Sequence, residues 1–514
     1  MTTERPTSLL LRLLGITLAL ALMAAACGSD DDSEEGESED STASTETDDA
    51  DTDSTDTSEA DSGEDSEAAV GGDSAIRLGI MGECEGAFGG FHEDVVAGTV
   101  LALINEAGAT SSSPTTALDG FTGASVAGAD IELVGIGCGD DTADRAIQEI
   151  RTLVEQNGAN VVIGPLSGDE GIAIANYAID HPDVTFVNGI AGAQDATLHV
   201  GAPNFFRFNA DGAQWNAGIG DVVFGEAGWR TAAVIADDYG FGWTSAAGFV
   251  ADFCAAGGEI VSYVYPPLGT TDYSSFVQQL PNPDEVDGYF WVVGGTGTNA
   301  ALEAFVNAKG DLNGSQHAGN LFFNPGIASV LGNDIAGAYV GGFASLPGDI
   351  ATPAITDYLA SADAAWDSLS GGLTGGETDD PSVTLGFGFA YGYYAGTLAF
   401  VRALDAVGGD LSDNHAALRE ELSTMTREAP YGAVSLDENR QAIADTFVAQ
   451  LVLDEASGEI VQQTVAIVPQ VDQTFGGTFS ADTPPPERDN TPCEARELPW
   501  HGNAIPVVDG VPQA

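Results

Sequence analysis

The stretch IELVGIGCGDDTADRAIQEIRTLVEQNGANVVIGPLS, residues 131–167, decides the fold. Its two ends, residues 131–136 and 161–163, are rich in Val, Ile and Leu, as strands often are. Between them, residues 142–156 place apolar side chains three and four positions apart, which is typical of an amphipathic helix. A strand, a helix and a strand in this order build a parallel sheet covered by helices. We therefore expect an α/β fold.

The same alternation runs through most of the chain after residue 75, and it restarts near residue 213. It predicts further strands at residues 76–81, 231–236, 260–265, 289–293 and 321–323. It predicts helices at residues 94–106, 215–227, 241–256, 273–280, 299–308, 355–369, 385–407 and 416–426. Strand-like runs then follow at residues 446–453 and 460–468 and need a sheet to pack on. We therefore expect the chain to cross back and to form two doubly wound parallel-sheet lobes.

The first residues have the three parts of an export signal. Arg5 and Arg12 are positive, the apolar run 13–23 is too short to span a bilayer comfortably, and small residues follow it. Cys27 comes directly after three alanines, so residues 1–27 resemble the signal peptide and lipobox of bacterial lipoproteins. This resemblance implies a lipid on the Cys27 thiol and a protein anchored on the extracytoplasmic face of the cell membrane. A plain signal peptide is the alternative.

Residues 28–74 contain 20 acidic residues and neither Lys nor Arg. Such a segment cannot bury enough surface to fold, so we expect a disordered tether. An acidic tail that binds a basic partner or cations is the alternative. Residues 75–514 carry 58 acidic and 12 basic side chains, a net charge of −46. Because nucleic acids and anionic membranes bind clustered Lys and Arg, this charge argues against both as partners.

Four cysteines follow Cys27 in an exported chain, where disulfides are favoured: Cys84, Cys138, Cys254 and Cys493. Four cysteines allow three connectivities. Cys84 and Cys138 both lie just beyond the carboxyl ends of consecutive strands, which we expect to be neighbours in the sheet. We therefore pair Cys84 with Cys138, and this leaves Cys254 for Cys493.

Several motifs in a fixed order carry a family resemblance over nearly all of residues 75–470. They are the opening strand with Gly86–Gly90, the quoted stretch with Gly139–Asp141 and Gly164–Ser167, the turn Asp238–Gly242, and Tyr431–Gly432 followed by Asp437–Asn439. In these motifs the chain resembles the solute-binding proteins of ABC importers of the branched-chain amino-acid (Leu/Ile/Val-binding) type. Proteins of that family have the periplasmic binding protein type I fold.

The resemblance implies a monomeric receptor that holds a small molecule between two lobes, without a cofactor, and delivers it to ABC permease subunits in the membrane. Lobe I would comprise residues 75–207 and 350–443, and lobe II residues 208–349 and 444–470. Residues 471–514 would form a C-terminal extension. Three hinge crossings would lie near Arg207, Pro347 and Ala444. The expected site agrees with a general rule, since ligands of open α/β sheets bind beyond the carboxyl ends of the strands.

In lobe I the resemblance implies four ligand-binding residues. Ser167 matches the family serine that takes the ligand carboxylate, and Gly168 starts a helix whose free N–H groups favour an anion. Capping of that helix is the alternative role of Ser167. Ile190 and Gly192 follow the next strand, where the family presents a backbone amide and a threonine hydroxyl. Gly192 stands at the position of the threonine, so one carboxylate contact is missing or replaced.

In lobe II, Tyr239 matches a family aromatic that lines the pocket, with closure of a turn as its alternative role. Thr296 lies in a family cleft loop, and Asn324 lies in the loop where amino-acid binders carry a glutamate for the ligand ammonium. Gly326 stands at the position of that glutamate. Because a buried cation needs a paired anion, this loss argues against an ordinary amino acid unless Glu83 or Glu85 substitutes for the glutamate.

The sequence contains few signs of catalysis. The six histidines show no metal-ligand spacing, and Cys-x-x-Cys, Gly-x-Ser-x-Gly and Walker-type motifs are absent. The aromatic stretch 386–394 is expected to be core packing. We therefore predict no catalytic residue and no metal, and a ligand that is amino-acid-like, an amide or an organic acid. Two alternatives stay open: a sensor for a membrane signalling partner, and a cell-envelope enzyme that uses an acid pair such as Glu83 and Glu85.

Overall fold

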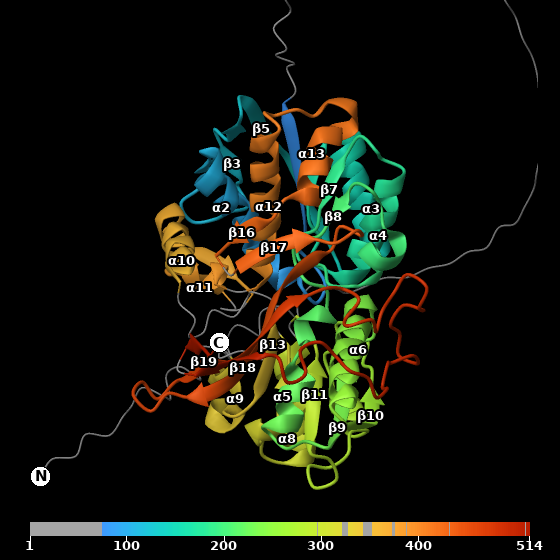
Figure 1. The fold of residues 1–514 in the computed structure, drawn as a ribbon. Coiled ribbons are helices and arrows are strands. Elements are labelled where there is room, and N and C mark those ends of the chain that lie inside the picture. Colours follow the sequence, from blue (N-terminus) through green and yellow to red (C-terminus); the bar gives the residue numbers. More distant parts are fainter. Residues whose placement is uncertain are drawn as a thin grey trace, which may run out of the picture. The chain divides into compact units, whose positions relative to one another are not determined.

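The computed structural model of the protein describes residues 75–295, 297–320, 327–342, 352–372, 376–386, 388–430, 432–508 and 510–513. This part of the chain contains two large sheets (Figure 1). The first sheet has six strands in the order β4-β5-β1-β6-β7-β8. Their bounds are β1 (Ile76–Glu83), β4 (Ser125–Val126), β5 (Ala129–Gly139), β6 (Val161–Ile163), β7 (Thr185–Val187) and β8 (Phe205–Phe206).

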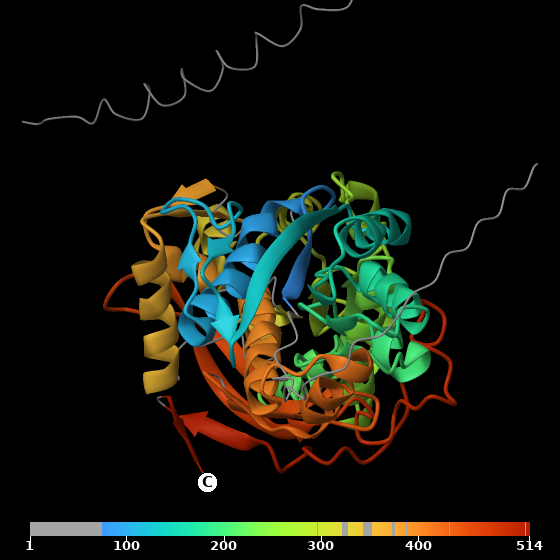
Figure 2. The same cartoon turned by 90° about the horizontal axis from the view of Figure 1, so that it is seen from above.

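Helices cover both faces of the first sheet, because its strands run parallel from β5 to β8 and each connection must cross over. One core layer includes α3 (Ala143–Arg151) and α4 (Gly168–Ile179). The opposite layer includes α2 (His92–Ala107) and α12 (Gly388–Ala406), which lie side by side (Figure 2). Their close approach needs a glycine, because a Cβ on Gly98 would lie 2.1 Å from the Ala390 carbonyl oxygen.

The second sheet has the order β10-β9-β11-β12-β13-β18-β19-β20-β21, with β17 and β16 attached to β18. Its parallel part consists of β9 (Thr231–Ala236), β10 (Glu259–Val264), β11 (Gly288–Val292), β12 (His317–Gly319) and β13 (Tyr339–Gly342). The later strands pair antiparallel, namely β16 (Arg427–Ala429), β17 (Gly432–Leu436), β18 (Ala442–Leu453), β19 (Ile460–Val471), β20 (Ile505–Val508) and β21 (Val511–Pro512). The second sheet is therefore mixed, whereas the sequence predicts a parallel one.

Residues of β11 alternate between the two faces of the second sheet, as the pleat requires. Phe290 stacks on Phe249 of α6 (Gly240–Ala255) with 3.9 Å between the ring centroids. Tyr289 and Trp291 instead contact Phe305 of α8 (Gly297–Lys309), at 4.8 and 5.7 Å. Helices α6 and α8 therefore cover opposite faces. Helix α5 (Ile219–Gly225) packs beside α6.

Shorter elements complete the described chain. They are α7 (Ser274–Val277), α9 (Ala328–Leu331), α10 (Pro353–Ala365), α11 (Pro381–Leu385), α13 (Ser412–Thr424), β2 (Thr110–Ser111), β3 (Phe121–Thr122), β14 (Leu369–Gly371) and β15 (Gly376–Thr378). The predicted strand 321–323 lies outside the described residues, and β12 is found a few positions earlier. None of the described helices has the length and apolar character that a membrane span requires.

A buried polar cluster lies where the chain leaves the first sheet. Arg207 follows β8, forms an isolated bridge with Gln441 and is fully buried. Its guanidinium donates to the Gln441 side chain, to the Ala193 carbonyl at 2.6 Å and to the Thr197 hydroxyl at 2.6 Å. Gln441 in turn donates to Gln214 at 2.8 Å. The buried polar side chains at this crossing between the sheets are therefore hydrogen-bonded, as buried polar groups in proteins usually are.

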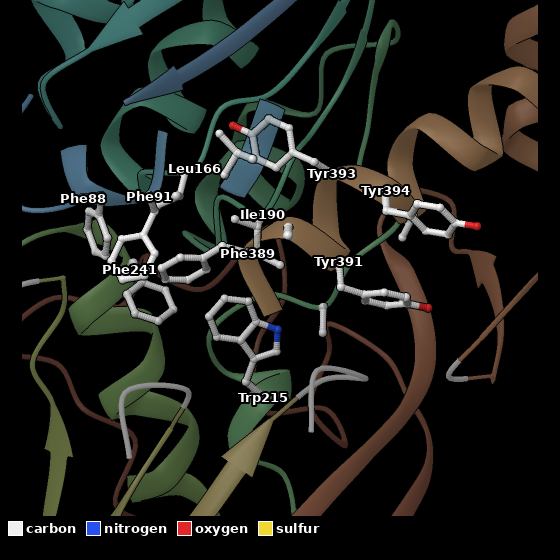
Figure 3. Packing of buried hydrophobic residues seen from close by; sticks show 14 of the residues in the cluster. Phe88, Phe91, Leu166, Ile190, Trp215, Phe241, Phe389, Tyr391, Tyr393 and Tyr394 are labelled. Carbon is white, nitrogen blue, oxygen red and sulfur yellow. The ribbon is translucent and has the colours of Figure 1, made fainter. Parts of the chain in front are cut away.

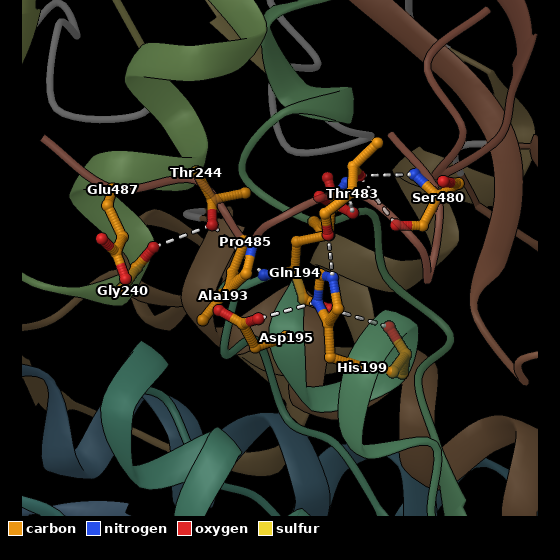
Figure 4. A network of polar contacts seen from close by, with 12 residues as sticks. Ala193, Gln194, Asp195, His199, Gly240, Thr244, Ser480, Thr483, Pro485 and Glu487 are labelled. Atoms are coloured by element: carbon orange, nitrogen blue, oxygen red, sulfur yellow. Dashed lines mark hydrogen bonds and ion pairs between the residues drawn. The ribbon is translucent and has the colours of Figure 1, made fainter. Parts of the chain in front are cut away.

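The C-terminal extension contacts segments near both sheets. Its Thr483 carbonyl accepts a hydrogen bond from His199 Nε2 at 2.9 Å, and His199 Nδ1 lies 2.8 Å from Asp195 (Figure 4). Farther along, Trp500 packs in the same apolar cluster as Ala247 and Ala251 of α6. The extension therefore fastens to the α6 side of the second sheet.

The structure contains both disulfides in the predicted pairing. Cys84 is bonded to Cys138, with Cα atoms 5.0 Å apart, and Cys254 is bonded to Cys493, with Cα atoms 5.2 Å apart. The first joins the ends of neighbouring strands β1 and β5. The second joins α6 to the C-terminal extension. The predicted fold class is confirmed.

Candidate functional site

The segments that follow the strand ends of the two sheets meet. Phe88 follows β1 in the first sheet and Tyr239 follows β9 in the second, and their ring centroids lie 6.5 Å apart. The amide of Gly240 donates to Asp169 Oδ1 at 2.9 Å across the same contact. We call this region, where carboxyl ends of strands from both sheets come together, the inter-sheet site. It is the place where ligands of α/β sheets bind.

Ser167 lies in the inter-sheet site with an unused hydroxyl. The residue precedes α4 in the N-cap position, but its side chain makes no capping hydrogen bond. Its side chain is 1% exposed and its hydroxyl has no hydrogen-bond partner, while its amide donates to Glu83 Oε1 at 2.6 Å. A buried hydroxyl without a partner costs free energy. Ser167 can therefore offer a hydrogen bond to a molecule held there.

The structure brings Gly168, Ile190 and Gly192 together beside Ser167 and places Phe241 over them. A Cβ on Gly168 would lie 2.9 Å from the Phe241 Cβ, and one on Gly192 would lie 2.7 Å from its ring. Ile190 is buried, and its amide already donates to the Pro165 carbonyl at 3.1 Å. The ring from the second sheet thus covers the predicted carboxylate cradle. The ligand-binding role of these residues stays a prediction.

Aromatic side chains from both sheets form a connected apolar wall (Figure 3). Neighbouring ring centroids lie 4.8 to 6.5 Å apart along the order Phe91, Phe389, Phe88, Tyr239, Phe241 and Trp215. All six side chains are buried. Rings at these distances attract one another and also offer flat faces to an apolar or aromatic group. The expectation that residues 386–394 pack the core agrees with the burial of Phe389, Tyr391, Tyr393 and Tyr394, and Phe389 also belongs to this wall.

The remaining predicted residues are not seen at the inter-sheet site. Glu85 is exposed, and its amide donates to the Gly139 carbonyl at 3.1 Å, beside the Cys84–Cys138 disulfide. Thr296 and Asn324 lie outside the described residues, as does Cys27. Their roles stay predictions.

Two buried carboxyl groups face each other at the end of β1. Glu83 accepts from the amides of Leu166 and Ser167, whereas Glu170 Oε1 accepts from the amides of Asp140 and Asp141. Glu170 also forms a side-chain hydrogen bond with Glu83. Burial, and then the charge of Glu83, raise the pKa of Glu170 to about 11. Glu170 therefore keeps its proton at neutral pH and shares it with Glu83, as adjacent carboxyls do.

Two aspartates extend this acidic end of the site. Asp141 Oδ2 accepts from the Ala87 and Phe88 amides, and Asp237 Oδ2 accepts from the Gly294 amide at 2.6 Å. The second carboxylate oxygen of each aspartate is buried without a partner. Burial, and then the nearby Glu83, raise the pKa of Asp141 to about 7. Burial also raises the pKa of Asp237 well above its usual range, so the acidic end is only partly ionised at neutral pH.

In the described residues, the one group of His, Cys, Asp and Glu side chains within metal-ligand reach is Cys84, Glu85 and Cys138. Both sulfur atoms of that group belong to a disulfide. A disulfide sulfur is not a thiolate ligand.

A family model described as "Periplasmic binding protein" matches residues 75–458. The chain belongs to the periplasmic binding protein family. Among curated relatives, Leu/Ile/Val-binding protein homolog 6 of Brucella abortus is 22% identical over 61% of this chain and 78% of its own length.

Solved structures of periplasmic binding proteins share this fold. A solute-binding protein of an ABC transporter from R. palustris, in complex with benzoate, has a TM-score of 0.63 at 18% identity. The structural alignment covers 78% of this chain and 98% of the R. palustris chain. A leucine-binding protein from Thermotoga maritima has a TM-score of 0.58 at 16% identity, and covers 77% and 99%. These likenesses support the fold of a two-sheet periplasmic binding protein.

Sequence reasoning missed several residues of this periplasmic binding protein. Asp141, Glu170 and Asp237 all lie just after strands or at a helix start, a position that could have marked them. In a chain with 79 acidic residues, however, one more carboxylate carries little information. Trp215 gave no signal beyond its size, because only the fold brings it to the aromatic wall, whereas Phe241 lies in the turn after the predicted strand and was expected near Tyr239.

Proposed function

We propose that this protein is a lipid-anchored extracytoplasmic receptor that captures a small molecule between two lobes and delivers it to an ABC importer. The observation that carries the proposal is the inter-sheet site in a chain of the periplasmic binding protein family. There, rings and buried polar groups of two sheets meet at the carboxyl ends of their strands. Such a place between two α/β units excludes water and is suited to a ligand.

We expect two lobes that move relative to each other, lobe I with residues 75–207 and 350–443 and lobe II with residues 208–349 and 444–470. Strand β17 lies in the lobe I range but pairs with β18 of the second sheet. The polar cluster of Arg207 and Gln441 supports a hinge near Arg207 and Ala444, because the chain passes there between sheets. Hinge closure on a ligand is a common motion of two-lobed proteins. A permease can detect the closed form.

The ligand would be amino-acid-like, an amide or an organic acid. Structural neighbours whose names state a ligand include proteins in complex with benzoate and with 3,4-dihydroxybenzoic acid, and a leucine-binding protein. The aromatic wall of the inter-sheet site suits an apolar body of that size. We assign no catalytic residue, because Glu83 is buried against two amides and Glu85 is exposed, which does not make an acid pair.

Native mass spectrometry of the purified protein identifies a co-purified solute, and calorimetry then measures its affinity. We expect the double variant Ser167→Ala, Tyr239→Phe to bind that solute at least about tenfold more weakly, because two polar contacts of the site are removed. Ser275→Ala, on an exposed helix, is the matched control and should bind normally.

Normal binding by the double variant would sink the site assignment. A sensor for a signalling partner would bind the same solute, so co-purification of permease and ATPase subunits separates import from sensing. Turnover of envelope polymers or small esters that is lost in Glu83→Gln would instead support an enzyme.

A further inference from the structure

The C-terminal extension passes from the first sheet to the second within a few residues. On the first-sheet side, the Thr483 carbonyl accepts a hydrogen bond at 2.9 Å from Nε2 of His199, which lies between β7 and β8 (Figure 4). On the second-sheet side, Arg488 forms an ion pair with Asp238, which follows β9. We call residues 483–488 the strut. The strut therefore joins segments that belong to different sheets.

The sequence of the strut makes it stiff. Its middle is Pro484-Pro485-Pro486, and each proline ring fixes φ at about −65° and restricts the residue before it to extended backbone. Consecutive prolines favour an extended spacer with a rise of about 3.1 Å per residue. Asn490 braces this spacer, since its side chain donates to the Pro485 carbonyl at 2.5 Å and accepts from the Glu487 amide at 2.6 Å. The chain itself therefore sets the distance between the two attachment points.

The two ends of the strut are attached differently. A surface ion pair alone is weak, but past the strut the chain is fixed covalently, because Cys493 is bonded to Cys254 of α6. On the first-sheet side the attachment is non-covalent: His199 donates a hydrogen bond to the strut, and the charges of Glu487 and Asp195 repel each other. The first-sheet end is therefore the end that detaches more easily.

The strut is attached beside the inter-sheet site. Asp238 is followed directly by Tyr239 and Gly240. The Gly240 amide donates to Asp169 Oδ1 at 2.9 Å, from the second sheet to the first. This hydrogen bond must break when the site opens. Because Arg488 holds the residue at the start of this turn, the strut restrains the turn that closes the site.

We propose that the strut holds the two sheets in the closed arrangement, and that the inter-sheet site opens only after Thr483 detaches from His199. The proposal rests on the two-lobe motion of the proposed function. Rotation of the lobes about the hinge near Arg207 changes the distance between His199 and Asp238, and a stiff spacer cannot follow that change. A solute would therefore enter and leave at the rate at which the strut detaches.

Hydrogen exchange measured by mass spectrometry, on the full chain freed of co-purified solute, tests the proposal. Exchange of the Gly240 amide requires its hydrogen bond to Asp169 to break, so residues 238–243 report opening of the site. Residues 288–292, which form β11 inside the second sheet, report global unfolding instead. The two readouts separate a strut that controls opening from a segment that only stabilises the fold.

Two independent changes release the strut. His199→Phe keeps a ring and removes the donor to Thr483, whereas Pro484→Gly, Pro485→Ser and Pro486→Gly together make the spacer flexible. We expect residues 238–243 to exchange about tenfold faster in each of the two variants, with the exchange of β11 unchanged. If His199→Phe fails to fold, the proline variant still decides.

His181→Phe is the matched control, because His181 also contacts a backbone carbonyl, that of Tyr177 four residues earlier, at 2.8 Å. It should exchange as the original does. Unchanged exchange of residues 238–243 in the proline variant overturns the proposal, and so does an equal rise in β11, because the strut then only supports the fold. Neither result depends on a solute, so native mass spectrometry and calorimetry still decide the proposed function separately.

Discussion

The carboxyl pair of Glu83 and Glu170 is the most unusual residue-scale feature of the molecule. Both side chains are fully buried, and their pKa values are shifted by burial, by neighbouring acidic side chains and by backbone amides. Backbone amides satisfy one oxygen of each carboxyl, and Glu170 keeps its proton beside Glu83. Glu83 therefore holds the loop Gly164–Ser167 through its amides without a basic partner. This arrangement requires that Glu170 stay protonated.

We predict that Glu170→Gln flattens the pH dependence of stability. The folded-state pKa of Glu170, about 11, lies above its ordinary value, so folding binds the proton more tightly and stability falls as pH rises above about 4.5. Asp141, with a pKa of about 7, adds to the fall up to neutral pH. The melting temperature of the original protein should therefore decrease from about pH 5 to about pH 9.

The melting temperature of the Glu170→Gln variant should decrease less over this pH range, because glutamine can keep the hydrogen bonds and does not ionise. Glu455→Gln, at an exposed position, should follow the original profile. Parallel profiles for all three proteins would show that Glu170 ionises normally.

At the scale of elements, Asp252 of α6 joins three parts of the chain. Its Oδ2 accepts from the amides of Gly220 and Asp221 at the start of α5, at 2.6 and 3.1 Å. Its Oδ1 accepts from Trp500 Nε1 at 2.7 Å and contacts His501 Nε2 at 2.8 Å. One fully buried carboxylate thus fixes α5 and the C-terminal extension to α6.

We expect Asp252→Asn to lower the free energy of unfolding by about 3 kcal/mol, because an amide cannot accept on both sides and leaves buried donors unpaired. Urea denaturation followed by tryptophan fluorescence measures the change. Asp284→Asn, at an exposed turn, should change it by less than about 0.5 kcal/mol. Equal curves for the two variants would contradict this role of Asp252.

Long periodic elements could be predicted from the sequence, and short paired ones could not. Residues 94–106 and 241–256 were expected as helices and correspond to α2 and α6, because each covers several turns of apolar spacing. Strands β8, β16 and β20 were not expected, since two to four residues carry no period and depend on pairing. Ser167, Tyr239 and the nearby Phe241 could be placed after strand ends from the sequence, whereas the contact between Phe241 and Trp215 required the fold.

At the scale of the whole molecule, the lipid anchor would decide where the receptor works. If Cys27 carries the lipid, Cys27→Ser should move the protein from the membrane fraction to the medium, with its affinity for the co-purified solute unchanged. Cell fractionation and immunoblotting measure the distribution, and replacement of Cys493 in place of Cys27 is the control that should stay with the membrane. Retention of the Cys27 variant in the membrane would contradict the lipid anchor.

The Cys254–Cys493 bond also determines how a pulling force on the C-terminus would travel. With the bond intact, and once β20 has separated from β19, tension applied beyond residue 493 enters α6 through the disulfide and does not extend β18 and β19. While the bond is intact, the 239-residue separation between the two cysteines would not contribute to the extension measured when the protein is pulled. Reduction would release it, adding about 80 nm of contour length. The disulfide is thus a mechanical shortcut across more than two hundred residues.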